Sequence, residues 1–285
     1  MTSSADAECL LLRSHSVRTC AVATAVVSAL LTGSVRASPP PITVKVATLN
    51  TKLGGESPWN PSEQIAVLAA EQPDVVLLQE ALYLQLDQYR NGIGAALHDG
   101  GWSGSYARHC ERGAAPTCDK YGAESVMVLT RLPIADSDAR LIWAQDRTWA
   151  ARGVVRVAVR VADGVVQIVS CHLPAGPIAT RARLHWVAEF SKWAAGLQQP
   201  QIVGGDFNDT PASRPVAAMK AGYADAWSAA GGRIGGTEAP DDMTYMNRYD
   251  YLFSSGGLEI KSVSIPPVKI SDHRPVVATY RLGRK

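Results

Sequence analysis

The feature of this sequence that most constrains its fold is a series of short apolar runs that each begin or end in one polar residue. The run VVLLQE stops at Glu80, VVQIVSCH stops at His172, and QIVGGD stops at Asp206. Short apolar runs bounded by turn-forming residues are typical of buried β-strands. We therefore expect a β-rich core whose strands carry polar side chains at their ends.

Helical patterns are fewer than strand patterns. Asn60-Pro61 predicts the start of one helix, a second helical stretch is expected to end near Leu97, and residues 181–196 form an amphipathic pattern. Many of the strands follow one another as hairpin-like pairs. This order favours mixed, mostly antiparallel sheets with helices packed outside over a strictly alternating parallel fold.

The N-terminal segment differs in composition from the rest of the chain. Two arginines precede the apolar run AVATAVVSALL, and Val35 and Ala37 are small residues at the positions that a signal peptidase reads. The run is too short to cross a bilayer. We predict a secretory signal peptide over residues 1–37 cleaved near Ala37, a secreted single domain over residues 38–285, and no stable membrane anchor. A disordered tail is the alternative.

Export would change the interpretation of the cysteines, because disulfides form in oxidising compartments. Cys110 and Cys118 flank a loop rich in glycine, alanine and proline, and we predict that they pair. A zinc site that includes His109 is the alternative, although no second Cys/His pair has suitable spacing. Cys171 lies inside an apolar run and is expected to be a buried free thiol.

The polar residues at the strand ends form a set that a hydrophobic core would not select. Each one alone has an ordinary explanation as a turn former, a helix cap or a hydrogen-bonded core histidine. Buried acids, however, are costly unless they are paired or bind a metal. We therefore expect the set to meet at one rim and form one site. The set comprises Asn50, Glu80, His172, Asp206, Asn208, Asp250, Asp272 and His273.

These residue types suit the metal-assisted hydrolysis of a phosphoester. A hard cation takes oxygen ligands, which Glu80 and Asp272 can supply, and Mg²⁺ is expected, with Mn²⁺ or Ca²⁺ as alternatives. The two histidines can stabilise negative charge on the phosphate. Asp206 and Asn208 can accept a proton from the attacking water and position it.

The motifs that carry these residues resemble those of the endonuclease/exonuclease/phosphatase superfamily, whose members have a deoxyribonuclease I-like fold. The matching segments extend from about Val44 to Tyr280 and occur in the family's order: TLN, LLQE, YGAESVMVLTRLPI, SCHLPAG, GGDFND, RYDYLF and SDHRPV. The resemblance implies an α/β (α+β) fold. It is a four-layer α/β sandwich, with two mixed, mostly antiparallel β-sheets face to face, helices outside and the site at one edge.

The resemblance also implies a role for each residue on the metal side. Glu80 is similar to the main metal ligand of the family. Asn50 and Asp272 resemble its companions, which act on the metal directly or through water.

On the hydrolytic side, Asp206 resembles the residue that orients or deprotonates the attacking water, with Asn208 beside it. His172 and His273 resemble the pair that binds the phosphate and transfers protons. Asp250 resembles the carboxylate behind His273.

Glu124 matches the glutamate that pairs with the first histidine in secreted deoxyribonucleases, and the alternative is a surface glutamate on an edge strand. A carboxylate behind each imidazole ring would fix its tautomer. Abasic-site endonucleases of the superfamily carry Tyr at the position of His172. The histidine therefore favours a general phosphodiesterase over an abasic-site repair enzyme.

The substrate class is less constrained, and nucleic acid, either DNA or RNA, is the leading expectation. The formal net charge of +2 neither indicates nor excludes a nucleic-acid partner. Arg152 is a candidate substrate contact, although Arg152, Arg156 and Arg160 alternate along one strand and a solvated sheet face is the alternative. Leu82 replaces the arginine with which secreted deoxyribonucleases enter the minor groove, which counts against double-stranded DNA.

Other partners stay open. Trp143 and Trp149 flank a loop that could contact a membrane interface, which would suit a sphingomyelinase or phospholipase C-type enzyme acting on a phospholipid head group. A soluble phosphate ester is disfavoured, because the GDLNYR-type and WCDR-type segments of inositol polyphosphate 5-phosphatases are absent. We expect a monomer, and a non-enzymatic binding protein on the same scaffold is the most distant alternative.

Overall fold

The structure is a computed structural model that describes residues 42–55, 58–109, 124–142, 151–176, 178–232, 235–238 and 247–283. The predicted signal peptide, the cysteines Cys110 and Cys118, and the tryptophans Trp143 and Trp149 lie outside these ranges. Within the ranges, no helix has both the length and the apolar character that a membrane span requires.

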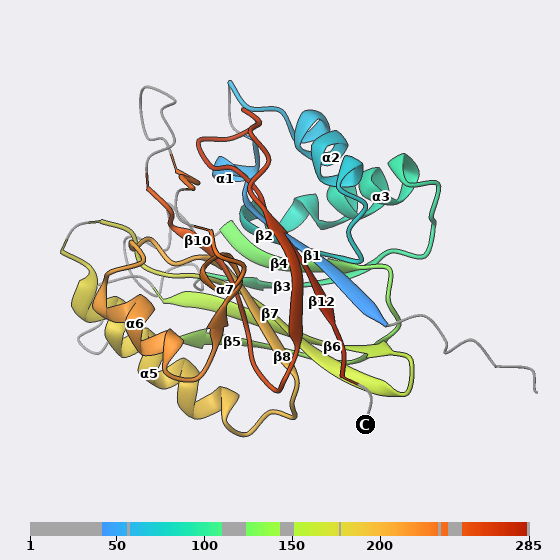
Figure 1. The fold of residues 1–285 in the computed structure, drawn as a ribbon. Helices are drawn as coiled ribbons and strands as arrows, with labels where there is room; N and C mark the ends of the chain where they lie inside the picture. Colours follow the sequence, from blue (N-terminus) through green and yellow to red (C-terminus); the bar gives the residue numbers. More distant parts are fainter. Residues whose placement is uncertain are drawn as a thin grey trace, which may run out of the picture. The chain divides into compact units, whose positions relative to one another are not determined.

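Two six-stranded sheets form the centre of the domain (Figure 1). The first sheet has the strand order β11-β12-β1-β2-β4-β3. Its strands are β1 (Thr43–Asn50), β2 (Val75–Leu82), β3 (Ser103–Arg108), β4 (Glu124–Thr130), β11 (Glu259–Ser264) and β12 (Val276–Arg281). Among these strands, β1 and β2 pair in parallel and the other neighbours are antiparallel.

The second sheet has the strand order β5-β6-β7-β8-β10-β9. Its strands are β5 (Ile134–Ile142), β6 (Arg152–Val161), β7 (Gly164–His172), β8 (Gln201–Asp206), β9 (Ala224–Asp225) and β10 (Asp250–Ser254). Here β7 and β8 pair in parallel, and the other described pairs are antiparallel. The prediction of two mixed, mostly antiparallel sheets is confirmed.

Helices cover the outer faces of both sheets (Figure 1). The helices α2 (Pro61–Ala70) and α3 (Leu86–Ala96) pack beside the first sheet, and α5 (Thr180–Ala194) and α6 (Arg214–Lys220) pack beside the second. Short helical turns complete the described set: α1 (Lys52–Gly55), η1 (Tyr83–Gln85) and α7 (Ala226–Ala229).

The predicted start of the first helix is confirmed. The side chain of Asn60 accepts a hydrogen bond from the backbone N–H of Ser62, and Pro61 occupies the first helical position. Both features stabilise a helix N-terminus, because they satisfy or remove N–H groups that lack a partner within the helix.

The core has three apolar layers, so central strands have apolar contacts on both faces. This explains why their sequences are continuous apolar runs. Val75 and Leu77 of β2 pack between the sheets against residues such as Ile168 of β7. Val76 and Leu78, on the opposite face of the same strand, pack beneath α2 and α3. A strand buried on both faces cannot alternate between apolar and polar residues. The four-layer sandwich is therefore confirmed.

The double glycine of GGD is required by close packing around β8. A Cβ atom on Gly204 would lie 2.6 Å from the side chain of Leu77 in the opposite sheet. A Cβ atom on Gly205, whose φ is +143°, would lie 1.9 Å from the carbonyl oxygen of Cys171. Cys171 is a buried free thiol, as predicted, and burial raises its pKa. The two glycines thus allow β8 to bring Asp206 close to both neighbouring strands.

A polar chain crosses the apolar layer between the sheets. The hydroxyl of Thr48 donates to Oε1 of Gln79 at 3.2 Å, and Nε2 of Gln79 donates to the hydroxyl of Ser170 at 3.2 Å. All three side chains are fully buried. The bond to Ser170 joins the two sheets one residue before Glu80 on one side and two residues before His172 on the other.

One alternative from the sequence is corrected by the structure. Arg156 does not lie on a solvated sheet face, since it is buried, donates to Gln167 at 2.9 Å and pairs with Asp136. This holds for Arg156 alone, since Arg160 farther along β6 is exposed and Arg152 is half-buried.

Candidate active site

The polar strand ends lie at the same edge of the sandwich because the strand registers make them direct neighbours across adjacent strands. His172 of β7 is the register partner of Asp206 of β8, and Asp206 is the partner of Asp250 of β10. In the first sheet, Asn50 ends β1 and pairs with the residue before Glu80.

Asp206 lies at the centre of the cluster and is 1% exposed. Its Oδ2 accepts from Nδ2 of Asn50 at 3.0 Å and lies 3.5 Å from Nε2 of His172 and 3.8 Å from Nε2 of His273. Its Oδ1 accepts from the backbone N–H of Asn208 at 2.7 Å. Burial raises the pKa of Asp206 to about 7, against the opposing charge of His273. A carboxyl with such a pKa suits proton transfer near neutral pH.

His273 is held in its charged form by a carboxylate from another strand. Its Nδ1 lies 2.8 Å from Oδ2 of Asp250, and Asp250 donates its backbone N–H to the hydroxyl of Thr237 at 3.1 Å. Burial disfavours the charge, but the carboxylates of Asp250 and Asp206 outweigh burial and raise the pKa of His273 to about 10. A charged imidazole of this kind can donate to a phosphate oxygen.

His172 has the opposite electrostatic environment. It is 2% exposed, and burial, together with the positive charge of Arg152, holds its pKa well below the usual range. Its Nδ1 is buried and has no hydrogen-bond partner among the described residues. The site therefore combines one neutral and one charged histidine on the two sides of Asp206.

Glu124 lies beside His172 rather than on the surface. It begins β4, is 4% exposed, and contributes one of three potential ligand atoms that lie within 4.8 Å of one another, with His172 and His109. The alternative of a surface glutamate on an edge strand is therefore wrong. His109 was considered from the sequence only as a zinc ligand, and its buried place beside His172 became visible only in the structure.

The three candidate metal ligands also lie at this edge. Nδ2 of Asn50 donates to Oε1 of Glu80 at 3.0 Å, and the backbone N–H of Leu53 donates to Oε2 of Glu80 at 3.2 Å. Asp272 pairs with the ammonium group of Lys52, with Nζ 2.9 Å from Oδ2. The carboxylates of Glu80 and Asp272 are hard oxygen donors, which suit a divalent cation such as Mg²⁺. The amide oxygen of Asn50 instead accepts from the backbone N–H of Lys52 at 3.0 Å, and its amide nitrogen faces Glu80.

A second group, Asp206, Asp250 and His273, also places three potential ligand atoms within 4.8 Å. The 2.8 Å contact between Nδ1 of His273 and Asp250, however, fits an ion pair within the protein. This ion pair already neutralises the charge of Asp250. The carboxylates of Glu80 and Asp272 therefore suit a cation better than this second group.

Backbone conformation at the site is unusual. Lys52, Leu53, Glu80 and Asn208 are non-glycine residues with φ between 47° and 56°. The register of β2 against β4 also shifts next to Glu80, which marks a β-bulge. Left-handed conformations are costly for such residues and concentrate at functional sites, where the surrounding structure enforces them.

The chain bends before β12, which allows the adjacent residues Asp272 and His273 to reach one site. The hydroxyl of Ser271 donates to the backbone carbonyl of Asn50 at 2.7 Å and fixes this bend to the end of β1.

Two arginines border the site. Arg152, the candidate substrate contact, is half-buried at the start of β6, and its charge acts on His172. Arg183 of α5 is buried, donates to Oδ2 of Asp209 at 2.9 Å, and donates to the carbonyl oxygen of Pro174 at 2.9 Å. Sequence reasoning missed Arg183, since an arginine on an amphipathic helix carries no sign of which distant loops it joins.

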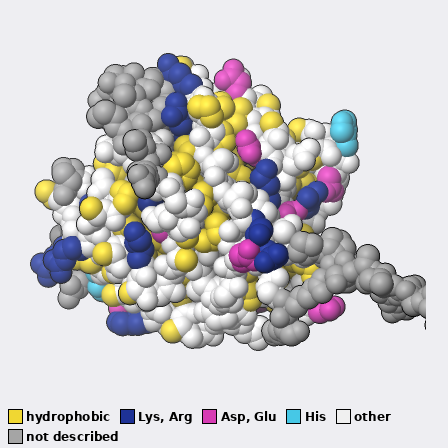
Figure 2. Space-filling view, viewed as in Figure 1, with side chains coloured by type: hydrophobic (Ala, Val, Ile, Leu, Met, Phe, Trp, Pro, Cys, Tyr) yellow, Lys and Arg dark blue, Asp and Glu magenta, His cyan; other side chains and the backbone are white. Residues whose placement is uncertain are grey.

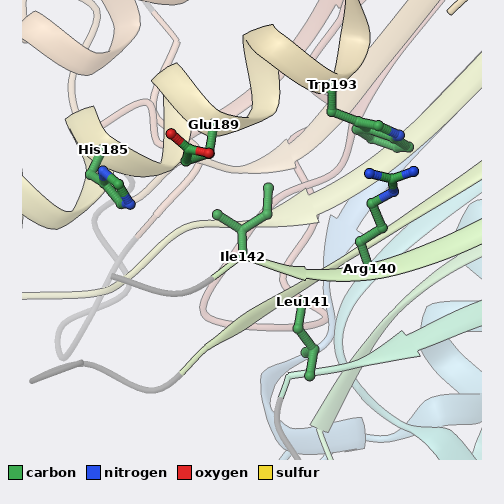
Figure 3. Close-up of a pocket in the computed structure, with 6 residues that line it drawn as sticks. All are labelled: Arg140, Leu141, Ile142, His185, Glu189 and Trp193. Carbon is green, nitrogen blue, oxygen red and sulfur yellow. The ribbon is translucent and has the colours of Figure 1, made fainter. Parts of the chain in front are cut away.

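A separate hollow of about 440 Å³ lies between β5 and α5 (Figure 3). The guanidinium group of Arg140 lies over the ring of Trp193 at 5.1 Å from its centre. The hollow is lined by Arg140, Leu141, Ile142, His185, Glu189 and Trp193. None of these residues belongs to the candidate site.

Solved structures share this fold at low sequence identity. An endonuclease/exonuclease/phosphatase family protein from Bacteroides thetaiotaomicron is 17% identical with a TM-score of 0.70, over 86% of this chain and 100% of that chain. The human Nocturnin catalytic domain with bound sulfate anion is 19% identical with a TM-score of 0.61, over 84% and 94%. A mannosyl-6-phosphatase from the same Bacteroides species is 16% identical with a TM-score of 0.64, over 82% and 98%.

No curated protein matches the sequence. The sequence model of the Endonuclease/Exonuclease/phosphatase family, in contrast, matches residues 47–273, a range that contains every candidate site residue from Asn50 to His273. The match covers most of the chain and agrees with the fold and with the edge at which the polar strand ends meet. The chain therefore belongs to the Endonuclease/Exonuclease/phosphatase family.

Proposed function

We propose that this protein is a divalent-metal-dependent phosphodiesterase. The observation that carries the proposal is the arrangement around Asp206, whose pKa is raised to about 7 between a neutral His172 and a charged His273. The candidate metal ligand Glu80 lies beside this group, since Nδ2 of Asn50 donates to both Asp206 and Glu80 at 3.0 Å. A proton acceptor, a charged donor and a cation site in contact are the requirements of phosphoester hydrolysis.

The proposal gives a part to Asp206, to His273 and to the candidate metal ligands. Asp206 accepts a proton from the attacking water, and Asn208 fixes the carboxylate through its backbone N–H. His273, charged through Asp250, donates to a phosphate oxygen. A cation held by Glu80, with Asn50 and Asp272 as companions, would neutralise developing negative charge on the phosphate.

Nucleic acid, DNA or RNA, is the proposed substrate class. The histidine at position 172 favours a general phosphodiesterase, and Arg152 supplies positive charge next to it. Lysine and arginine side chains lie in small separate groups on the face shown in Figure 2 and do not form one continuous stripe. Leu82, the register partner of Glu124, lies beside the site and carries no positive charge, which counts against a groove contact with duplex DNA there.

A phospholipid head group is the second candidate, and exposed apolar side chains favour it. Leu84 is 76% exposed and Ile178 is 81% exposed. They follow Glu80 and His172 closely in the chain, so both lie on segments that leave the site edge. Such side chains can insert into a membrane interface.

The metal-dependent reaction is tested with bis-p-nitrophenyl phosphate. We expect turnover with Mg²⁺ or Mn²⁺ that EDTA abolishes. His273→Ala should lower turnover by about 10²–10⁴-fold, since it removes a proton-handling group. Glu80→Ala should weaken metal binding measured by calorimetry. No metal-dependent turnover of any phosphoester would refute the proposal.

The substrate class is tested with a parallel panel of supercoiled plasmid, single-stranded DNA, RNA, sphingomyelin liposomes and sugar or inositol phosphates. Preferred cleavage of DNA or RNA supports the nuclease. Cleavage of sphingomyelin that falls in a Leu84→Ser and Ile178→Ser double variant would favour the lipid enzyme instead.

We also propose that the protein is secreted, on the strength of the basic, apolar and small-residue pattern in residues 1–37. N-terminal sequencing of protein recovered from the culture medium tests this. The proposal requires a mature chain that starts near residue 38.

A further inference from the structure

His109 is a fully buried histidine that the proposed reaction does not use. It follows β3, and its backbone N–H donates to the carbonyl oxygen of Glu124 at 3.1 Å. Its ring meets the ring of His172 edge-on, with the centroids 5.2 Å apart. His109 therefore contacts the ring of His172 and the backbone of Glu124, whose side chain is the candidate orienting carboxylate.

The tautomer of His109 is determined by its neighbour. The backbone N–H of Gly153 donates to Nδ1 of His109 at 3.2 Å. A backbone N–H can only donate, so Nδ1 must offer a lone pair. Burial, and next the charge of Arg152, hold the pKa of His109 well below its usual range. The ring is therefore neutral, with its single proton on Nε2.

Gly153 makes this contact possible. A Cβ atom at this position would lie 2.5 Å from the carbonyl oxygen of Arg108 in the other sheet. Only glycine allows the backbone of β6 to come this close to the end of β3. The approach brings the Gly153 N–H within reach of the imidazole.

His109 belongs to a small buried group of polar side chains. Among the described residues, Nε2 of His109 and Nδ1 of His172 are both buried without a hydrogen-bond partner. Potential ligand atoms of these two rings and of Glu124 lie within 4.8 Å of one another. Distances of this size suit direct hydrogen bonds after small side-chain shifts, or bonds through one buried water.

A metal ion does not suit this group. Ligation through Nε2 would require an unprotonated nitrogen there, while the Gly153 N–H already requires an unprotonated Nδ1. His109 would then have to be an imidazolate anion. A hydrogen-bond network agrees with the protonation that the Gly153 N–H requires of His109.

We propose that His109 is a positioning residue for His172. Its Nε2–H holds the carboxylate of Glu124, and that carboxylate holds the proton of His172 on Nδ1. Nε2 of His172 is thereby left as an acceptor 3.5 Å from Oδ2 of Asp206, where it can take on the proton that Asp206 receives from the attacking water. The expected effect of His109 on turnover rests on the proposed function, whereas the hydrogen-bond network does not.

Two substitutions separate hydrogen bonding from packing. His109→Gln keeps an N–H donor near the position of Nε2, and His109→Phe keeps the ring and removes the donor. We expect His109→Phe to lower kcat by about 10–100-fold, as is typical when the partner of an active-site ligand is lost. His109→Gln should retain most of the activity, with KM little changed in both variants.

Long-range ¹H–¹⁵N spectra of the histidine rings give a readout that needs no turnover. In the wild-type protein we expect His109 protonated on Nε2 and His172 protonated on Nδ1. His109→Gln should preserve the His172 tautomer, and His109→Phe should shift it toward protonation on Nε2. The same two substitutions at His185, in the hollow of Figure 3, are matched controls and should change neither kcat nor the spectra.

The outcomes are distinct. Wild-type His109 protonated on Nδ1, or an unchanged His172 tautomer in His109→Phe, would overturn the proposal. Equal impairment of both variants with unchanged spectra would reduce His109 to a packing residue. If the protein cleaves no phosphoester, the proposed function fails, but the spectra still decide whether His109 sets the tautomer of His172. If His109→Phe does not fold, the wild-type and His109→Gln spectra decide.

Discussion

At the scale of single residues, identical side chains take different charge states because their neighbours differ. His109 and His172 are buried beside the charge of Arg152 and stay neutral. His273 is as deeply buried, but two carboxylates face it and keep it charged. The cost of burying a charge is thus offset only where an opposite charge lies within a few ångströms.

In the proposed reaction, Lys52 would compete with the metal ion for Asp272. Its ammonium group lies 2.9 Å from the carboxylate, and its side chain is 42% exposed, so the pair is weak and screened. Lys52→Gln should free Asp272 and lower the concentration of Mg²⁺ needed for half-maximal activity by about two- to five-fold. A titration of activity with Mg²⁺ measures this, with Lys192→Gln on the exposed face of α5 as the control. A higher Mg²⁺ requirement in Lys52→Gln would contradict the competition.

His109 should make stability depend on pH. Its pKa in the folded protein lies well below the usual 6.5 of the unfolded chain. As the pH falls below about 6.5, the unfolded state binds a proton that the folded state does not, so the free energy of unfolding decreases. The decrease is about 1.4 kcal/mol per pH unit for one such group.

Urea unfolding of the wild type and His109→Gln at about pH 5.5 and pH 7.5 tests this linkage. The contribution of His172 is common to both proteins, so it cancels in the comparison. The wild type should lose more stability than His109→Gln on acidification, and parallel losses would show that His109 does not resist protonation.

At the scale of elements, glycines decide how closely strands approach the site. Gly205 has a left-handed φ of +143°, and an added Cβ would collide with the carbonyl of Cys171 in the neighbouring strand. Backbone atoms cannot move aside without breaking the parallel pairing of β7 and β8, on which the register of His172 with Asp206 depends.

Gly205→Ala should therefore destabilise the fold by about 3 kcal/mol or more, within the range of severe backbone effects. Gly222→Ala is the matched control, because nothing lies within 4 Å of the place that its added methyl group would take and its φ is not left-handed. Chemical denaturation should show a change within about 0.5 kcal/mol for Gly222→Ala. A similarly small effect at Gly205 would mean that β8 can shift without cost.

At the scale of the whole domain, the site exists only when the two sheets are packed together. Asn50 and Glu80 come from the first sheet, whereas His172, Asp206 and Asp250 come from the second. The bond from Asn50 to Asp206 joins the two halves at the edge, and the bond from Gln79 to Ser170 joins them in the interior.

Gln79→Leu should lower the free energy of unfolding by about 1–3 kcal/mol, because it leaves the hydroxyl of Thr48 without the carbonyl that accepts its hydrogen bond. A double-mutant cycle with Ser170→Ala measures the direct coupling across the sheets. We expect about 0.5–1.5 kcal/mol of coupling. Additive effects of the two substitutions would show that this bond does not hold the sheets together.

The sequence by itself determined the strands, their mixed pairing and the set of polar strand ends. A strand that is buried on both faces requires a continuous apolar run. A polar residue such as Glu80 or Asp206 at the end of such a run can therefore be recognised from the sequence alone. The helix start at Asn60 was equally readable, because its cap depends on residues close in the chain.

Only the tertiary structure decided which of these residues act on one another. The 2.8 Å contact of His273 with Asp250, the burial of Glu124 and the place of His109 against His172 all depend on strand register and on the packing of one sheet against the other. Charge states followed the same rule, since a pKa responds to groups within a few ångströms, and those groups come from distant parts of the chain. Local sequence determines which side chain stands at the end of each strand. The packing of the two sheets determines the distances between those side chains.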